Sequence, residues 1–94
     1  MKAKLAPSLF KKLKKLDVRI RNSFKERIFI FQKDPVDSQL NNHKLRDPYK
    51  NLRSIDITND YRAIYEEIKV GKETVSYFLL LGTHDELYRK RQSS

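Results

Sequence analysis

The chain has two histidines, His43 and His84, and these are the side chains best suited to transfer protons. An imidazole exchanges its proton near neutral pH, where an ordinary carboxylate or ammonium group does not. A pair of imidazoles can therefore supply both a general acid and a general base. The alternative for each is an ordinary histidine in a surface loop. We predict acid–base chemistry at these two positions.

Arg62 and Tyr88 are candidates for holding a substrate beside the histidines. A guanidinium can bind a phosphate through two parallel hydrogen bonds, and a tyrosine ring can stack on a nucleobase. The alternative for Arg62 is an ion pair with Asp56, which contributes little when it is exposed to solvent. The alternative for Tyr88 is that its ring covers the end of a sheet.

Several other chemistries lack the residues that they need. The chain has no cysteine and only two glycines, so the sequence excludes a disulfide framework, a thiolate metal site and a phosphate-binding glycine loop. The histidines do not show the short-range spacing of metal sites, and no serine lies in a nucleophile-elbow motif. We therefore expect neither a bound metal nor a serine hydrolase.

The side chains named above must be positioned by a hairpin with a turn at residues 58–60. A three-residue turn pairs Asp56 with Arg62, whereas a two-residue turn would pair Asp56 with an alanine. Only the three-residue turn gathers the apolar residues on one face: Ile55, Ile57, Tyr61, Ala63 and Tyr65. We expect Asn59 to adopt the left-handed conformation in this turn. The opposite face of the sheet then carries Asp56, Arg62 and His84.

A third strand and a short helix complete the C-terminal half. Residues 74–81 are strongly apolar, which favours a central strand, and they follow a turn at residues 70–72. Gly82 is expected to end this strand. Residues 84–89 then form a short helix, with two acidic residues in its first turn, where negative charge is favoured.

The first 33 residues are expected to form a strand and two helices. Residues 2–6 alternate charged and apolar side chains, which is typical of an edge strand. Apolar residues then recur every three or four positions, at Leu9, Leu13, Leu16, Ile20, Phe24, Ile28 and Phe31, and they predict an amphipathic helical stripe that packs in the core. One continuous helix is possible, but a compact domain favours helices over 8–16 and 18–33.

The boundaries of these helices carry their own signals. Ser8 can cap the first helix and Asp17 the second, because both side chains accept hydrogen bonds from free backbone N–H groups. Asp34 precedes a proline, which disfavours the helical conformation and ends the second helix. Residues 34–50 then form a long connection. Connections of this length in compact domains are often functional, and this one carries His43, Lys44 and Arg46.

The positive charge of the chain is concentrated at its N-terminus. Residues 1–33 contain eleven Lys and Arg against two acidic residues, which accounts for the whole net charge of +9, whereas residues 34–94 are balanced. A basic segment attracts polyanions or an acidic protein partner, and the alternative is a solvated helix face. There is no signal peptide and no apolar run long enough to span a membrane, so we expect a soluble, cytoplasmic protein.

Three stretches together are characteristic: LNNHKL at 40–45, LRSIDITNDYRAIYE at 52–66 and LLLGTHDELY at 79–88. They resemble the RelE/ParE superfamily of toxins from toxin–antitoxin pairs, and most of all its YafQ-like mRNA interferase branch. SLFKKLKKLD and FKERIFIFQKDP extend the resemblance over nearly the whole chain.

The resemblance implies a fold and an activity. The fold is a single α+β domain over residues 1–94, in which a small, antiparallel-rich four-stranded sheet packs on two N-terminal helices and a short C-terminal helix follows. The activity is that of a ribonuclease without metal or cofactor, which generally cuts mRNA on the translating ribosome. A partner antitoxin binds and silences such a toxin.

The resemblance also implies roles for single residues. The family motifs correspond to His43, Asp60, His84, the aromatic Tyr88 and the phosphate-binding Arg62. YafQ-type members often carry a second histidine where this chain has Asp56, so the general base remains open among His43, Asp60 and Asp56, with His84 as the acid. Lys44, Arg46 and Arg53 are additional cations for substrate binding.

The implied reaction needs no water as nucleophile. A base takes the proton of a ribose 2′-OH, the oxygen attacks the adjacent phosphate, and an acid protonates the departing 5′-oxygen, while Arg62 stabilises the charge that develops on the phosphate oxygens. Two rival functions remain: a non-nucleolytic, ParE-like inhibitor of gyrase, and a plain basic nucleic-acid-binding module.

Overall fold

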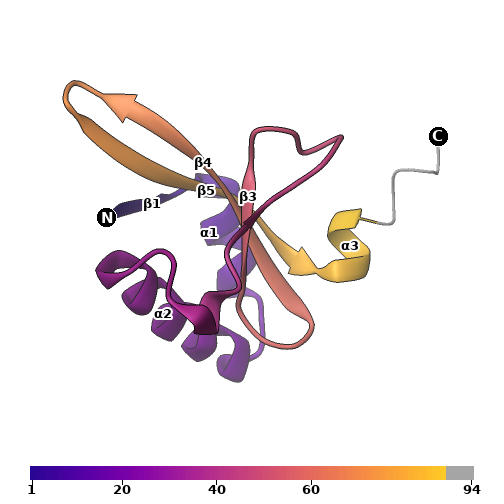
Figure 1. The fold of residues 1–94 in the computed structure, drawn as a ribbon. Coiled ribbons are helices and arrows are strands. Elements are labelled where there is room, and N and C mark those ends of the chain that lie inside the picture. The colour runs from indigo at the N-terminus through magenta and orange to yellow at the C-terminus, as the bar shows by residue number, and fades with distance from the viewer. Residues whose placement is uncertain (89–94) are drawn as a thin grey trace.

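A five-stranded sheet organises the molecule, with the strand order β1-β5-β4-β3-β2 (Figure 1). The computed structural model of the chain describes residues 1–88. The strands are β1 (Lys2–Leu5), β2 (His43–Lys44), β3 (Arg53–Asp56), β4 (Tyr61–Val70) and β5 (Glu73–Thr83). All neighbouring strands are antiparallel except β1, which runs parallel to β5 at one edge, as the predicted edge strand.

The prediction of a four-stranded sheet was wrong in its strand count. The fifth strand, β2, comes from the segment 34–50, which also forms the short helix η1 (Ser38–Leu40). Asn41 ends η1 in the left-handed conformation, at φ 49°, and directs the chain into β2. Two extended residues are too few to show the alternation by which strands are recognised in a sequence.

The break between the N-terminal helices, α1 (Pro7–Lys14) and α2 (Val18–Lys33), is confirmed. Asp17 caps α2, because its Oδ1 accepts a hydrogen bond from the Arg19 N–H at 2.7 Å. The prediction of Ser8 as the cap of α1 was wrong. Ala6 occupies that position, and Pro7 starts the helix because its fixed φ suits the first helical residue and its missing N–H is not needed there.

Both N-terminal helices contribute apolar side chains to one core. The prediction had both of them pack on the sheet, but they pack against different elements. Helix α1 packs against β5, whereas α2 packs against β1 and η1. The buried core residues are Ala6, Leu9, Leu13, Phe24, Phe31, Leu40, Ile55, Ile57, Ala63, Tyr65, Phe78 and Leu81. At its centre the ring of Phe31 meets those of Tyr65 and Phe78 edge-on, with centroids 5.0 and 5.2 Å away.

The predicted register of the β3–β4 hairpin is confirmed: Asp56 pairs with Arg62. The prediction of a left-handed Asn59 was wrong, because no residue of this turn has a positive φ. The hydroxyl of Thr58 instead accepts hydrogen bonds from the backbone N–H groups of Asp60 and Tyr61, at 3.2 and 3.0 Å. The Thr58 hydroxyl thereby stabilises this turn, whereas other hairpins use a left-handed residue.

The strand β5 lies inside the sheet, between β1 and β4, although β4 is the middle strand. It begins after a turn in which Gly71 has φ 65°. The prediction that Gly82 ends this strand was wrong, since Gly82 pairs with Arg62 and the strand continues to Thr83. Helix α3 (His84–Tyr88) follows directly, as predicted, while Arg89 lies outside the described residues.

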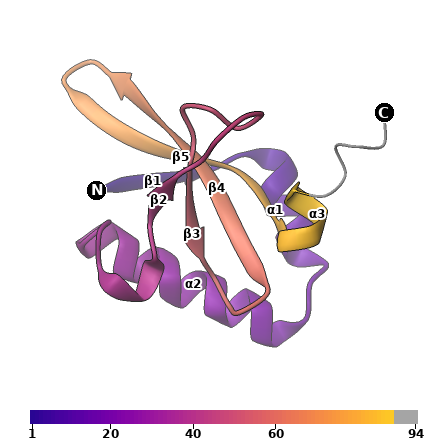
Figure 2. The ribbon, with the colours of Figure 1, turned by 45° about the vertical axis from the view of Figure 1, so that its right-hand side comes forward.

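The connection between β2 and β3 lies between two other parts of the molecule. Figure 2 shows it between the turn that joins β4 to β5 and the helix α3, and Figure 1 shows the same arrangement. Its two arms are joined by a hydrogen bond of 3.0 Å from the Leu45 N–H to the Leu52 carbonyl. No helix among residues 1–88 is long and apolar enough to cross a membrane.

Candidate active site

The structure brings most of the predicted site residues to one pocket of about 370 Å³. We call it the two-histidine pocket. It is lined by Asn41, His43, Lys44, Leu45, Arg46, Ser54, Arg62, His84 and Tyr88. These residues come from β2, β3, β4, α3 and the segments flanking β2. The sheet therefore brings together residues that are far apart in the sequence. Six of the nine predicted site residues therefore share one cavity.

His43 is held on β2 with a defined orientation. Its Nδ1 lies 2.8 Å from the backbone carbonyl oxygen of Asn41. A carbonyl oxygen only accepts hydrogen bonds, so Nδ1 carries the proton of the neutral imidazole and Nε2 carries none. Asn41 has the left-handed conformation that ends η1. An imidazole in this form is able to accept a proton.

His84 is the first residue of α3, and the start of this helix is fixed from two directions. The His84 N–H donates to the backbone carbonyl of Asp60 at 3.0 Å, which ties α3 to the β3–β4 turn. The ring of His84 packs against that of Tyr88, with centroids 4.6 Å apart. The ring of Tyr88 also packs against that of Tyr49, with centroids 5.8 Å apart. The Tyr49 hydroxyl donates a hydrogen bond to the Leu87 carbonyl.

A reciprocal capping box holds the N-terminus of α3. The Thr83 N–H donates to Glu86 Oε1 at 2.9 Å, and the Glu86 N–H donates to Thr83 Oγ1 at 3.1 Å. Lys12 of α1 also binds Glu86 Oε1, at 3.1 Å. A β-carbon on Gly82 would lie 2.8 Å from this oxygen, so the glycine leaves room for the cap.

The charge of Glu86 is stabilised by the same contacts. The hydrogen bond from the Thr83 N–H, and after it the one from Lys12, hold the pKa of the Glu86 carboxyl below its ordinary value. The negative charge also sits at the end of α3 where backbone N–H groups point outward. Glu86 thus links α1 to the helix that carries His84.

Arg62 is immobilised by the hairpin turn. Its Nη1 donates to three backbone carbonyls of the turn, those of Thr58, Asn59 and Tyr61, at 3.0, 2.9 and 3.2 Å. Its Nε lies 3.0 Å from Asp56 Oδ1, and the two side chains are only 21% and 28% exposed. Nη2 is the guanidinium nitrogen left for a ligand, so bidentate binding of a phosphate would require these contacts to be exchanged.

Three of the predicted residues do not line the two-histidine pocket. Asp56 lies beside it and holds Arg62. Asp60 contributes its backbone carbonyl to α3, and its side chain lies in the exposed turn. Arg53 is the first residue of β3, and its Nε donates to Asn42 Oδ1 at 2.8 Å. Their assigned roles in catalysis and substrate binding stay predictions.

Sequence reasoning missed several residues that shape the site. Asn41, Leu45 and Ser54 line the pocket; they stand in the stretches that carry the family resemblance, but no role was predicted for them. Lys12 is brought to Glu86 only by the fold. Thr83 and Glu86 do carry a signal, because the spacing Thr-x-x-Glu at a helix start is that of a capping box.

No protein-family model and no curated protein sequence matches the chain. Solved structures do. A YoeB/ParE toxin from Agrobacterium tumefaciens is similar with a TM-score of 0.71 at 18% identity, over 89% of this chain and 99% of that one. YafQ from E. coli strain BL21(DE3) is similar with a TM-score of 0.71 at 20% identity, over 92% and 96% of the two chains.

A third similar structure is that of an archaeal RelE–RelB complex from Pyrococcus horikoshii OT3, with a TM-score of 0.68 at 25% identity, over 87% of this chain and 92% of that one. The fold is therefore that of the RelE/ParE toxin superfamily, which confirms the resemblance that the sequence predicts. YafQ is among the structures that share it.

Proposed function

We propose that the protein is the toxin of a type II toxin–antitoxin system and a metal-independent endoribonuclease that cleaves mRNA. The observation that carries this proposal is the two-histidine pocket, in which His43, His84 and the immobilised Arg62 face one cavity. A proton acceptor, a proton donor and a fixed positive charge are what cleavage by an RNA 2′-OH requires.

His43 is the general base of this reaction. Its neutral ring presents an unprotonated Nε2, because Nδ1 donates to the Asn41 carbonyl. The Nε2 takes the proton of the 2′-OH, and the 2′-oxygen forms a bond to phosphorus. The bond from phosphorus to the 5′-oxygen then breaks. His84, as the imidazolium, gives its proton to that oxygen, and the products are a 2′,3′-cyclic phosphate and a 5′-hydroxyl.

Arg62 supplies the charge that the phosphate needs as it becomes five-coordinate. The contacts to the turn carbonyls and to Asp56 fix the guanidinium before substrate binds, so little reorganisation is needed. Asp56 then acts as the residue that positions Arg62, and Asp60 positions His84 through its backbone carbonyl. Neither aspartate is needed as the base.

Substrate is held by the cations and the aromatic ring around the histidines. Lys44 and Arg46 are exposed at the wall of the pocket and attract phosphates of the RNA backbone. Tyr88 offers its ring for stacking on a base next to the cleaved linkage. Because Tyr88 also contacts His84, a bound base would restrict the imidazole further.

The partners follow from the charge distribution and from the similar structures. The RelE–RelB complex is one such structure, and a toxin–antitoxin complex RelBE2 from Mycobacterium tuberculosis is another. We expect an antitoxin to form a complex with this chain as well. The +9 charge of residues 1–33 suits ribosomal RNA or an acidic segment of that antitoxin.

Inducible expression followed by mapping of transcript 5′ ends tests the proposal. The wild type is expected to arrest growth and to produce new mRNA ends at recurrent codon positions, and His84→Ala is expected to produce neither. Growth arrest with DNA damage and intact transcripts would instead support the gyrase inhibitor. Absence of both would leave a basic binding module.

Charge reversal on α1 separates the two candidate roles of the basic segment. Lys11, Lys14 and Lys15 are changed to Glu together, while Lys12 is kept because it binds Glu86. Loss of ribosome binding with antitoxin binding retained assigns the segment to ribosomal RNA, and the reverse result assigns it to the antitoxin. Both interactions are expected to weaken with added salt.

A further inference from the structure

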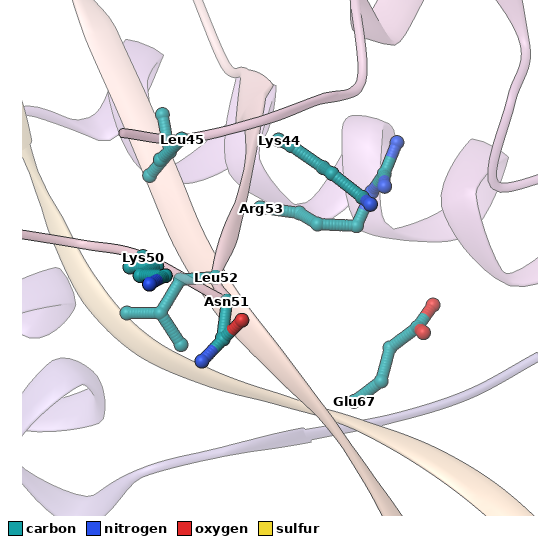
Figure 3. Close-up of a pocket in the computed structure, with 7 residues that line it drawn as sticks. All are labelled: Lys44, Leu45, Lys50, Asn51, Leu52, Arg53 and Glu67. Carbon is teal, nitrogen blue, oxygen red and sulfur yellow. The ribbon is translucent and has the colours of Figure 1, made fainter. Parts of the chain in front are cut away.

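A second pocket, of about 330 Å³, lies against the two-histidine pocket. We call it the Glu67 pocket. Figure 3 shows the residues that line it: Lys44, Leu45, Lys50, Asn51, Leu52, Arg53 and Glu67. Lys44 and Leu45 line both pockets and form the wall between them. A chain-like ligand that fills the first pocket therefore reaches the second by crossing this wall.

The charged groups of the Glu67 pocket are available to a ligand. Within the described part of the chain, the side chains of Lys44, Lys50 and Glu67 make no hydrogen bond or ion pair. Arg53, in contrast, is oriented by its hydrogen bond to Asn42. Three cations and one carboxylate thus surround one cavity without neutralising one another through direct pairs.

The remaining walls of the Glu67 pocket are apolar and held in place. Leu45 and Leu52 are half-buried, and the backbone hydrogen bond between them fixes the two arms of the β2–β3 connection. In Figure 3 the side chains of Lys50, Leu52 and Asn51 lie on one side of the group, and the ends of Lys44 and Arg53 lie on the other side, as does the carboxylate of Glu67. The pocket therefore offers cations, apolar side chains and one carboxylate to a ligand.

We propose that the Glu67 pocket binds the RNA nucleotide next to the cleaved linkage, an inference that rests on the proposed nuclease function. The phosphate of that nucleotide lies on Lys50, and its base lies against Leu45 and Leu52. Glu67 accepts a hydrogen bond from an exocyclic amino group of the base. Adenine, cytosine and guanine carry such a group and uracil does not, so the pocket discriminates against uracil.

The shape and position of the pocket favour this ligand over an isolated anion. A phosphate alone would leave the apolar wall unused and would face the negative charge of Glu67. A nucleotide has both a charged phosphate and an uncharged base, and the pocket offers lysines together with apolar side chains and Glu67. Because the two pockets share a wall, a ligand in the Glu67 pocket lies next to the two-histidine pocket. The volume of the Glu67 pocket is within the range of about 300–1,000 Å³ for small-molecule sites.

Binding of short RNAs tests the inference. The probe spans the mapped cleavage site and carries a 2′-deoxy sugar at the cleaved linkage, so it cannot react. It is compared with probes one nucleotide longer on the 5′ or the 3′ side, each with all four bases at the added position. For the wild type, lengthening on one side is expected to tighten binding by about tenfold, and least for uracil.

Variants of the pocket carry the decisive comparison. Lys50→Ala should abolish the gain from lengthening, and Glu67→Gln should abolish the discrimination against uracil, while both bind the shorter probe as the wild type does. The controls are Lys72→Ala, at the β4–β5 turn, and Glu66→Gln, the neighbouring carboxylate on β4, neither of which lines the pocket. Both controls should keep the gain and the discrimination.

The outcomes separate this inference from the proposed function. A wild type that cleaves RNA but gains nothing from lengthening would refute the second subsite alone. Variants that keep the full gain, or that weaken the shorter probe as much as the longer one, would also refute it. A wild type that neither binds nor cleaves RNA would refute the nuclease, and the subsite with it.

Discussion

The two pockets beside the β2–β3 connection share a wall and a similar volume, yet they differ in what they can do. The two-histidine pocket holds two imidazoles, together with a guanidinium that the turn immobilises. The Glu67 pocket holds three cations and a carboxylate, and of these Arg53 is hydrogen-bonded to Asn42. The first is built to react and the second only to bind.

The two-histidine pocket is lined by Arg62 and two histidines, and the Glu67 pocket by Arg53 and a glutamate, so variants of the two pockets can be compared. If the comparison is right, changes in the two-histidine pocket reduce the rate of the chemical step. Changes in the Glu67 pocket reduce affinity and alter base preference. Changes in the cap of α3 affect the stability of the protein. The predictions below follow in order of decreasing effect.

Removal of either imidazole is expected to have the largest effect. His43→Ala and His84→Ala should each lower the cleavage rate by about 10²–10⁴-fold, because each removes one proton-transfer group. The double variant should lose less than the product of the two losses, since the residues act in one reaction. Cleavage of a short RNA under single-turnover conditions measures this.

The Glu67→Gln variant is the control for the histidine experiment, and it should cleave the same short RNA at the wild-type rate. Thermal unfolding of the histidine variants should match that of the wild type, because neither ring lies in the core. A His43→Ala protein that cleaves at nearly the wild-type rate would transfer the role of base to Asp56 or Asp60.

The two arginines test the distinction between reacting and binding. Arg62→Ala should lower kcat by about 10²–10³-fold, the loss expected when a fixed donor to a developing negative charge is removed. Arg53→Ala should mainly raise KM, because Arg53 lies in the Glu67 pocket. Steady-state kinetics on one RNA substrate measures both. Equal losses of kcat in the two variants would contradict the division of labour.

Asp56→Asn sharpens the result for Arg62. If Asp56 only orients the guanidinium, the three turn carbonyls should still hold Arg62, and the rate should fall by less than about tenfold. A loss of 10²–10⁴-fold, as large as that expected for a general base, would instead assign Asp56 to proton transfer.

Replacement of Glu86 is expected to have the smallest effect, and this effect is on the stability of the fold. The pKa of Glu86 is lowered in the folded protein, so its charge stabilises the fold above the pKa that Glu86 has when unfolded. This stabilisation is lost as the pH falls through the lower, folded value. Glu86→Gln should therefore lower the free energy of unfolding at neutral pH by less than about 1 kcal/mol, and the difference from the wild type should vanish in acid.

Urea unfolding at several pH values measures the effect of Glu86. Glu73→Gln is a matched control, because Glu73 pairs with Lys2 at the same distance of 3.1 Å but caps no helix. Glu67→Gln should leave stability unchanged. A Glu73 variant as pH-sensitive as the Glu86 variant would show that the capping box adds nothing to an exposed ion pair.

Local patterns in the sequence predicted much of the fold. The apolar stripe predicted helical structure, and the small size of the domain, with Asp17 as a possible cap, predicted the break between two helices. The apolar residues on either side of the β3–β4 turn predicted the register, since a shift by one residue would expose all of them. The turn itself was less predictable, because Thr58 replaces the expected left-handed Asn59.

The candidate site was predicted as a set of residues but not as a cavity. His43, Lys44, Arg46, Arg62, His84 and Tyr88 were named from their chemistry and the family resemblance, and they line one pocket. Asp56 and Asp60 were named in the same way, yet their contacts make them supports of Arg62 and His84. Which of two carboxylates binds a neighbour and which faces solvent depends on distances that a sequence does not contain.

The sequence by itself determined the helices, the hairpin register, the balance of charge and the inventory of groups able to transfer protons, because each depends on residues close together in the chain. The tertiary structure decided that β2 joins the sheet, that Lys12 reaches Glu86 and that two pockets share the wall formed by Lys44 and Leu45. These features depend on how strands distant in sequence pack side by side, and packing is a property of the whole core.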